Sequence, residues 1–354
     1  MLNKFTDQVA LVTIFIQRIK PYVEPTQLNP AVQYCQEIFP VLARLVEVFS
    51  DFVPVLERVC RCWRHMVLSY RAASMPLLPQ LAEQLSAGFS ASKQGCFLWA
   101  TDSIIREFSA DGENVDAATS EAIFHFYERQ TQTFLQALSD LTPEELPDVI
   151  EDFFRMSVDV LLYFPLQTLS STLIPHILSA ANSSLTLLKE EPLTATLHFL
   201  RDFLAYGGPD NPSSTLDQLP NQSRGNPPEV QTAVKHLLAT EGEVITQRVL
   251  TGMMYTFPRD CFPDASGVLL GLFQILPQET AQWVATTITL LPAGSVAPRE
   301  SERLLQSINA CLQQGEMRKV RVLLQDFTNA YRRRNVAPRE GLGRLEATKF
   351  RFTQ

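Results

Sequence analysis

Apolar residues recur at helical spacing along nearly the whole chain, and this periodicity restricts the fold more than any other feature. Phe5, Val9, Val12 and Ile16 return every three or four residues, the spacing that places side chains on one face of an α-helix. Similar stripes occupy residues 30–49, 52–71, 76–89, 94–109, 117–140, 144–164, 166–181, 192–206, 228–256, 262–276, 278–291, 299–314 and 316–334. No segment alternates polar and apolar residues long enough to predict a β-strand. The sequence therefore predicts an all-α protein.

The residues between the stripes favour helix starts. Asn29-Pro30, Thr142-Pro143 and Ala297-Pro298 each place proline where the first helical turn tolerates it, and Asn29 and Thr142 add a capping side chain. The connections are short, so each pair of helices occupies about 40 to 45 residues, the period of HEAT-type repeats. Such a pair cannot cover its own apolar face and must stack on its neighbours. The predicted architecture is an elongated, curved α-solenoid of HEAT-type helix pairs.

The pattern predicts one array over residues 1–354, with about seven or eight pairs. A segment near 207–228 is rich in Gly, Pro, Ser and Asn, and is predicted to be a disordered insertion between helices. A loop that binds a partner is the alternative for this segment. Residues near 332–354 are basic and are predicted to form a C-terminal tail.

Composition excludes several classes of protein. With 354 residues of which 45% are hydrophobic, the chain can bury a core and is not disordered throughout. A net charge of −8 disfavours direct DNA binding and general binding of nucleic acids. Apolar runs such as 158–164 fall short of the roughly 20 residues of a membrane-spanning helix, so no membrane insertion is expected. Six cysteines without paired spacing indicate a reducing, intracellular compartment.

Motifs of catalysis and metal binding are missing from the sequence. It has no nucleophile elbow, phosphate-binding loop or dinucleotide fingerprint. Cys60 and Cys62 have the wrong spacing for a zinc knuckle and project about 200° apart on a helix, so they are predicted to pack in the core. The five histidines are isolated and are predicted to lie on helix surfaces or half-buried. We therefore expect no enzyme activity, no cofactor and no metal site.

One helix carries an arginine stripe. Along residues 55–70 the apolar side chains share one face, whereas Arg58, Arg61 and Arg64 share the other and Arg71 lies two turns beyond Arg64. Guanidinium groups suit forked recognition of phosphate or carboxylate. A dedicated binding surface is one interpretation of the stripe. The other is an ordinary solvated helix surface, in which Glu57 pairs with Arg61 and nearby acids neutralise the remaining arginines.

Several short segments resemble one protein family. They are 36–42 (QEIFPVL), 56–64 (LERVCRCWR), 95–99 (GCFLW), 153–156 (FFRM), 199–203 (FLRDF), 324–328 (LQDFT) and 331–340 (YRRRNVAPRE). In this order they resemble the C-terminal half of the importin-β-like karyopherins, in the branch of transportin-SR and the fungal mRNA transport regulator. The resemblance implies a HEAT-repeat solenoid that carries cargo into the nucleus and shuttles between nucleus and cytoplasm.

The resemblance also implies partners and a site. An arginine-rich helix of transportin-SR binds the arginine/serine-rich domains of splicing factors, and Arg58, Arg61 and Arg64 fall on that motif. The family has a further arginine where this chain has Leu68, so Ser/Arg-rich or RGG-type RNA-binding proteins are both expected as cargo. Nucleoporins and the small GTPase Ran are further implied partners, with Ran bound mainly by N-terminal repeats of a chain more than twice this length. A helical-repeat scaffold or adaptor unrelated to Ran-dependent transport is the alternative function.

Charge is distributed unevenly. Residues 101–152 contain 13 acidic and 2 basic side chains. In a stacked array they should lie about 10 to 20 Å from the arginine stripe, one or two repeats away. This predicts a groove of two signs, with Asp111, Glu113, Asp116 and Glu121 contacting cargo arginines. The alternative is that these acids only keep the protein soluble.

Overall fold

The computed structural model describes residues 2–24, 27, 29–109, 115–209 and 225–336. Within these ranges the structure contains helices and no strands, which confirms the predicted all-α class. The chain divides into two compact units, residues 1–177 and 178–354. The predicted insertion falls largely at 210–224 and the predicted tail largely at 337–354, both outside the described residues; residues 332–335 of that tail belong to the last helix.

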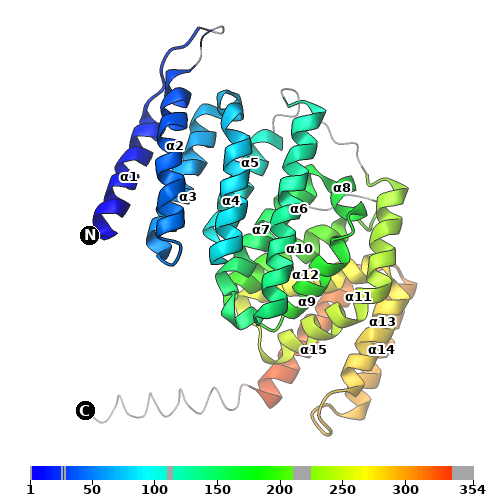
Figure 1. Ribbon diagram of the computed structural model, residues 1–354. Helices are drawn as coiled ribbons and strands as arrows, with labels where there is room; N and C mark the ends of the chain where they lie inside the picture. The colour runs from blue at the N-terminus through cyan, green and yellow to red at the C-terminus, as the bar shows by residue number, and fades with distance from the viewer. Residues whose placement is uncertain (1, 25–26, 28, 110–114, 210–224, 337–354) are drawn as a thin grey trace, which may run out of the picture. The chain divides into compact units, whose positions relative to one another are not determined.

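The first unit contains two rows of helices, which Figure 1 shows at the blue-to-green end of the chain. In one row α3 packs against α1 and α5, and α5 also packs against α7. In the other row α4 packs against α2 and α6. The helices of this unit are α1 (Leu2–Arg18), α2 (Pro30–Val48), α3 (Val53–Tyr70), α4 (Leu78–Ser92), α5 (Cys96–Ser109), α6 (Ala117–Asp140), α7 (Pro147–Tyr163) and α8 (Pro165–Ser170), with the 3₁₀ turns η1 (Arg71–Leu77) and η2 (Pro143–Glu145).

The second unit is built in the same way. Helix α12 packs between α10 and α15, and α13 lies against α11 and α14. Its helices are α10 (Glu190–Ala205), α11 (Pro228–Tyr255), α12 (Phe262–Ile275), α13 (Pro277–Thr289), α14 (Pro298–Gln313) and α15 (Met317–Asn335), with the 3₁₀ turn η4 (Arg259–Cys261). The boundary between the two units, Ile177 and Leu178, falls within helix α9 (Ile174–Ser184).

Aromatic side chains fill the core of the first unit. Trp63 is 1% exposed and stacks on Phe39, with 5.5 Å between ring centroids. Phe134 of α6 stacks on Phe153 of α7, with 3.7 Å between centroids, so the two rows of helices meet through these rings. Burial of large side chains of this kind contributes about 1.5–3 kcal/mol each, which makes these contacts a main source of the unit's stability.

Two of the predicted helices differ from the structure. The stripe at 166–181 is interrupted: α8 ends at Ser170, Ser171 is extended, and Pro175 stands in the first turn of α9. The stripe predicted from residue 144 begins later, because Thr142 and Glu145 form a capping box on the short turn η2 and α7 begins at Pro147. At the second place Pro147 restricts the residue before it, Leu146, to a non-helical conformation.

No helix in the described part of the chain is long and apolar enough to cross a membrane.

Candidate partner-binding surface

Helix α3 has one face in the core and one face with arginines. Its buried residues are Val55, Leu56, Val59, Cys60, Cys62, Trp63, Met66, Val67 and Tyr70. These residues pack toward the neighbouring helices, so the positions between them are directed outward. Both cysteines are buried, as predicted, and burial raises the pKa of the Cys62 thiol to about 11. Helix α3 therefore holds its charged side chains at fixed positions on one side of the unit.

Arg58 and Arg61 are exposed on this outward face. Neither guanidinium has an ion-pair or hydrogen-bond partner among the described residues, and the pair between Glu57 and Arg61 that the sequence allowed is not formed. The two arginines are one turn apart, so their guanidinium groups can reach the same ligand. They are the part of the predicted stripe that is free to bind a partner.

Arg64 is in a different environment. Its guanidinium carbon lies 5.2 Å from the centroid of the Trp99 ring on α5, and its side chain is half-buried. Its Nε is buried without a hydrogen-bond acceptor in the described structure. Arg64 shares the arginine face with Arg58 and Arg61 but is less exposed than they are, because the indole ring of Trp99 on α5 covers it.

Arg71 lies beyond the end of α3. The helix ends at Tyr70, and Arg71 has a φ of 46°, in the left-handed region that non-glycine residues rarely adopt. Its Nε lies 3.3 Å from Glu107 Oε1 on α5. Arg71 therefore lies outside the helical series of Arg58, Arg61 and Arg64, and its side chain pairs with α5.

A pair of carboxyl groups, Asp102 of α5 and Asp159 of α7, lies near Arg64. Asp102 of α5 and Asp159 of α7 share a hydrogen bond, and burial together with the charge of Asp159 raises the pKa of Asp102 to about 8. Arg106 lies 3.7 Å from Asp159, and the charges of Arg106 and Arg64 partly offset the rise. Nothing in the sequence spacing indicates this cluster, because its members come from three different helices.

His65 borders the arginine face. Its Nε2 lies 2.7 Å from Gln17 Nε2 of α1. Burial and the charges of Arg64 and Arg61 lower the pKa of His65, so the imidazole is neutral at pH 7. The surface beside α3 consequently carries the charge of the arginines and none from His65.

Two of the four predicted acidic contacts, Asp116 and Glu121, lie at the start of α6. Asp116 caps α6, where its Oδ1 accepts a hydrogen bond of 2.7 Å from the Thr119 backbone N–H. Glu121 is exposed on α6, with its Oε1 3.7 Å from His125 Nε2. Helix α6 belongs to the row with α4, whereas α3 belongs to the row with α5. Asp111 and Glu113 fall outside the described residues.

Comparison with known proteins places these features in context. Residues 29–135, which include all of α3, match the model of the fourth TPR domain of transportin-3 and importin-13. The chain is 32% identical to an uncharacterized protein of Schizosaccharomyces pombe over 96% of this chain and 35% of that protein. It is 23% identical to the mRNA transport regulator MTR10 of Saccharomyces cerevisiae, over 95% of this chain and 36% of MTR10.

More distant relatives agree with these matches. Human importin-13 is 21% identical over 86% of this chain and 29% of its own length. A solved structure of importin-13 in its cytosolic state superposes with a TM-score of 0.73 at 16% identity, covering 94% of this chain and 35% of that chain. This likeness confirms the helical-solenoid fold. The chain spans about a third of the length of the relatives that it matches. By these matches the chain is a homologue of the importin-β-like karyopherins, in the branch that contains transportin-3, importin-13 and MTR10.

Proposed function

We propose that this chain is part of a nuclear transport receptor, and that Arg58 and Arg61 bind the acidic or phosphorylated groups of Ser/Arg-rich RNA-binding cargo. The observation that carries the proposal is the exposure of both arginines, without an ion-pair partner, on a helix inside the segment that matches the transportin-3/importin-13 domain. An arginine left unpaired next to a packed core presents a forked set of donors that suits phosphate and carboxylate.

Arg64 has a supporting role in this proposal. Its contact with Trp99 fixes the guanidinium close to the α3 surface, where it adds positive charge beside Arg61. Arg71 already pairs with Glu107 and is proposed to contribute only to the surrounding charge. The cargo site then consists of two exposed arginines and one packed arginine. Leu68, which is half-buried, leaves the following turn of α3 without a further guanidinium, and RGG-type cargo stays a second candidate.

The other proposed partners follow from the relatives. As a receptor of this branch the protein would bind Ran and nucleoporins and shuttle between nucleus and cytoplasm. The named relatives are transport proteins, and the proposal includes no catalytic step. These activities belong to relatives about three times as long as this chain, so we propose them for the protein that contains this segment.

A second contact is proposed for the arginines of the cargo. Asp111, Glu113, Asp116 and Glu121 are the acids near the start of α6 that would attract them. Neutralising all four as Asn or Gln is expected to weaken binding of an arginine-rich peptide without phosphate and to flatten the salt dependence of its affinity. Because Asp116 caps α6, the variant with only Glu121→Gln and Asp111→Asn separates a loss of charge from a loss of the cap. An unchanged affinity and salt slope in the fourfold variant would eliminate this contact.

The main proposal is tested by the double variant Arg58→Ala/Arg61→Ala. Charge-assisted hydrogen bonds contribute about 1.5–3 kcal/mol each when well formed, so we expect a labelled phosphorylated Ser/Arg peptide to bind at least about tenfold more weakly. Both positions are exposed, where substitutions usually change stability by about 0.5 kcal/mol or less, so the fold should persist. The matched control is Arg44→Ala, since Arg44 is an exposed arginine on α2 that pairs with Glu47 at 2.8 Å. If the double variant and the wild type bind the peptide with equal affinity, the arginine face is an ordinary solvated surface and not a binding site.

A further inference from the structure

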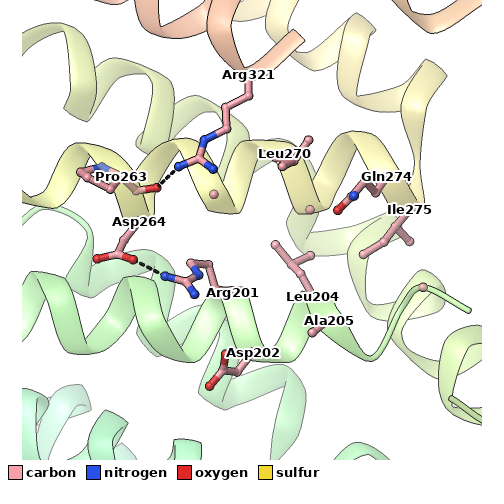
Figure 2. Close-up of a pocket in the computed structure, with 13 residues that line it drawn as sticks. Arg201, Asp202, Leu204, Ala205, Pro263, Asp264, Leu270, Gln274, Ile275 and Arg321 are labelled. Carbon is pink, nitrogen blue, oxygen red and sulfur yellow. Dashed lines mark hydrogen bonds and ion pairs between the residues drawn. The ribbon is translucent and has the colours of Figure 1, made fainter. Parts of the chain in front are cut away.

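The second unit has a groove of its own. A cavity of about 320 Å³ runs along α12, between α10 and α15. Figure 2 shows two different ends: Arg201, Asp264 and Arg321 gather at one, and Leu204, Leu270 and Ile275 line the other. The groove therefore combines a charged end with an apolar end.

Two arginines approach the charged end from opposite sides. Arg321 of α15 donates from Nε to Ser266 Oγ and from Nη2 to the Pro263 carbonyl oxygen, both at 2.9 Å. Arg201 of α10 donates from Nη1 to Asp264 Oδ1. A guanidinium has five N–H donors, so further donors on both arginines are without a partner among the described residues. These contacts fix the position of both groups and leave part of their binding capacity unused.

The charges at this end do not cancel. Asp264 is shared between Arg201 and His198, whose Nε2 lies 3.1 Å from Asp264 Oδ2. Arg321 has only neutral acceptors, a hydroxyl and a carbonyl, and no described carboxylate forms an ion pair with it. Asp202 also lines the groove, and Figure 2 shows its side chain directed away from both arginines. The first turn of α12 lies at the same end, and its dipole adds to the positive potential.

We propose that this groove binds an extended polypeptide, with a carboxylate or phosphate monoester held between Arg201 and Arg321 and a neighbouring apolar side chain against Leu204, Leu270 and Ile275. Bidentate contacts of arginine with such anions are strong and geometrically specific. The site lies in the other unit from α3 and goes beyond the cargo contact proposed for Arg58 and Arg61. Asp264 competes with the ligand for Arg201.

The experiment measures fluorescence anisotropy of labelled peptides that alternate leucine with glutamate, phosphoserine or glutamine, added to the full chain. Every variant is made in the Arg58→Ala/Arg61→Ala background, so that the α3 arginines do not contribute. Binding of the glutamate or the phosphoserine peptide supports the site, and the tighter of the two identifies the anion. Arg321→Gln is expected to weaken binding at least about tenfold, and the glutamine peptide is expected not to bind.

Asp264→Asn is expected to have the opposite effect, because it releases Arg201 to the ligand and so strengthens binding. A purely structural role of these residues would not produce this gain. Arg333→Gln is the matched control, since Arg333 is an exposed arginine on α15 that does not line the groove. Gln325 still donates to Ser266 Oγ at 2.8 Å in Arg321→Gln, so α15 should stay docked, and thermal melting checks this.

The proposal is overturned if neither acidic peptide binds, if a folded Arg321→Gln variant binds as well as the background, or if Asp264→Asn fails to strengthen binding. Loss of the Ser/Arg peptide contact in Arg58→Ala/Arg61→Ala bears only on α3, so the two proposals fail separately.

Discussion

At the scale of single residues, the Asp102–Asp159 pair shows how burial changes the chemistry of a carboxyl group. Asp102 is held between α5 and α7, and its pKa is raised to about 8 by burial and by the neighbouring carboxylate. In the unfolded chain an aspartate titrates near 3.9. Between about pH 4 and pH 8 the folded state consequently binds more protons than the unfolded state. Asp152 acts in the same direction, because burial and the charge of Glu151 raise its pKa to about 7.

Because the folded state binds more protons than the unfolded state, the free energy of unfolding is expected to fall as the pH rises. A carboxyl group whose pKa is raised in the folded state contributes most to the free energy of unfolding at a pH below its pKa in the unfolded chain. This contribution is lost as the pH rises through its pKa in the folded state. We expect the midpoint of urea unfolding to fall between pH 5 and pH 8 in the wild type. Asp102→Asn, which cannot ionise, should remove part of this fall and be more stable than the wild type at pH 8.

The control for this measurement is Asp51→Asn, because Asp51 is an exposed aspartate in the same unit. It should keep the pH dependence of the wild type. A pH dependence that is identical in Asp102→Asn and the wild type would mean that Asp102 does not hold a proton in the folded state.

At the scale of helices, the sequence predicted most of the elements within a few residues. Helices α6, α12 and α14 lie close to their predicted ranges, and Asn29 caps α2 by accepting a hydrogen bond of 2.9 Å from the Ala31 N–H. The pattern succeeded because buried residues at helical spacing and capping residues are local signals. It failed at 166–181, where the apolar spacing continues through Ser171 although the backbone does not.

Contacts between helices depend on how side chains of two different elements fit together, and Gly88 is an example. A Cβ at Gly88 of α4 would lie 2.2 Å from Phe97 Cε1 of α5, a buried ring. Gly88→Ala is therefore expected to destabilise the protein by about 1–3 kcal/mol, the usual cost of overpacking. Phe97→Leu should recover part of this loss in the double variant, because the smaller side chain leaves room for the new methyl group.

Urea denaturation of the two single variants and the double variant measures this coupling. Ser90→Ala, at an exposed position of α4, is the control and should change stability by about 0.5 kcal/mol or less. If the effects of Gly88→Ala and Phe97→Leu simply add, the close contact between α4 and α5 at this point does not exist.

At the scale of the whole molecule, the sequence predicted the fold class and the relationship to transport receptors, but only part of the candidate site. Arg58 and Arg61 are exposed as helical spacing requires. The positions of Arg64 and Arg71 depend on Trp99 and Glu107, and no local pattern indicates contacts with residues some 35 positions away. The groove along α12 was missed for the same reason, because α10, α12 and α15 contribute one side chain each to its charged end.

The prediction of a single array over residues 1–354, with about seven or eight pairs, stays a prediction. The structure gives two compact units that share one way of packing, with a central helix between two neighbours in the same row. The relatives extend over about three times this length, so the proposed transport activity refers to the longer protein in which such a segment occurs.

The central claim is that the α3 arginines contact the acidic groups of the cargo, and a double-mutant cycle tests it most directly. The affinities of the wild type and Arg58→Ala/Arg61→Ala are measured for a phosphorylated Ser/Arg peptide and for the same peptide without phosphate. Direct contact predicts that removing the arginines weakens binding of the phosphorylated peptide more, with a coupling free energy of about 1.5 kcal/mol or greater. A coupling of zero, with both peptides weakened equally or not at all, would contradict the claim.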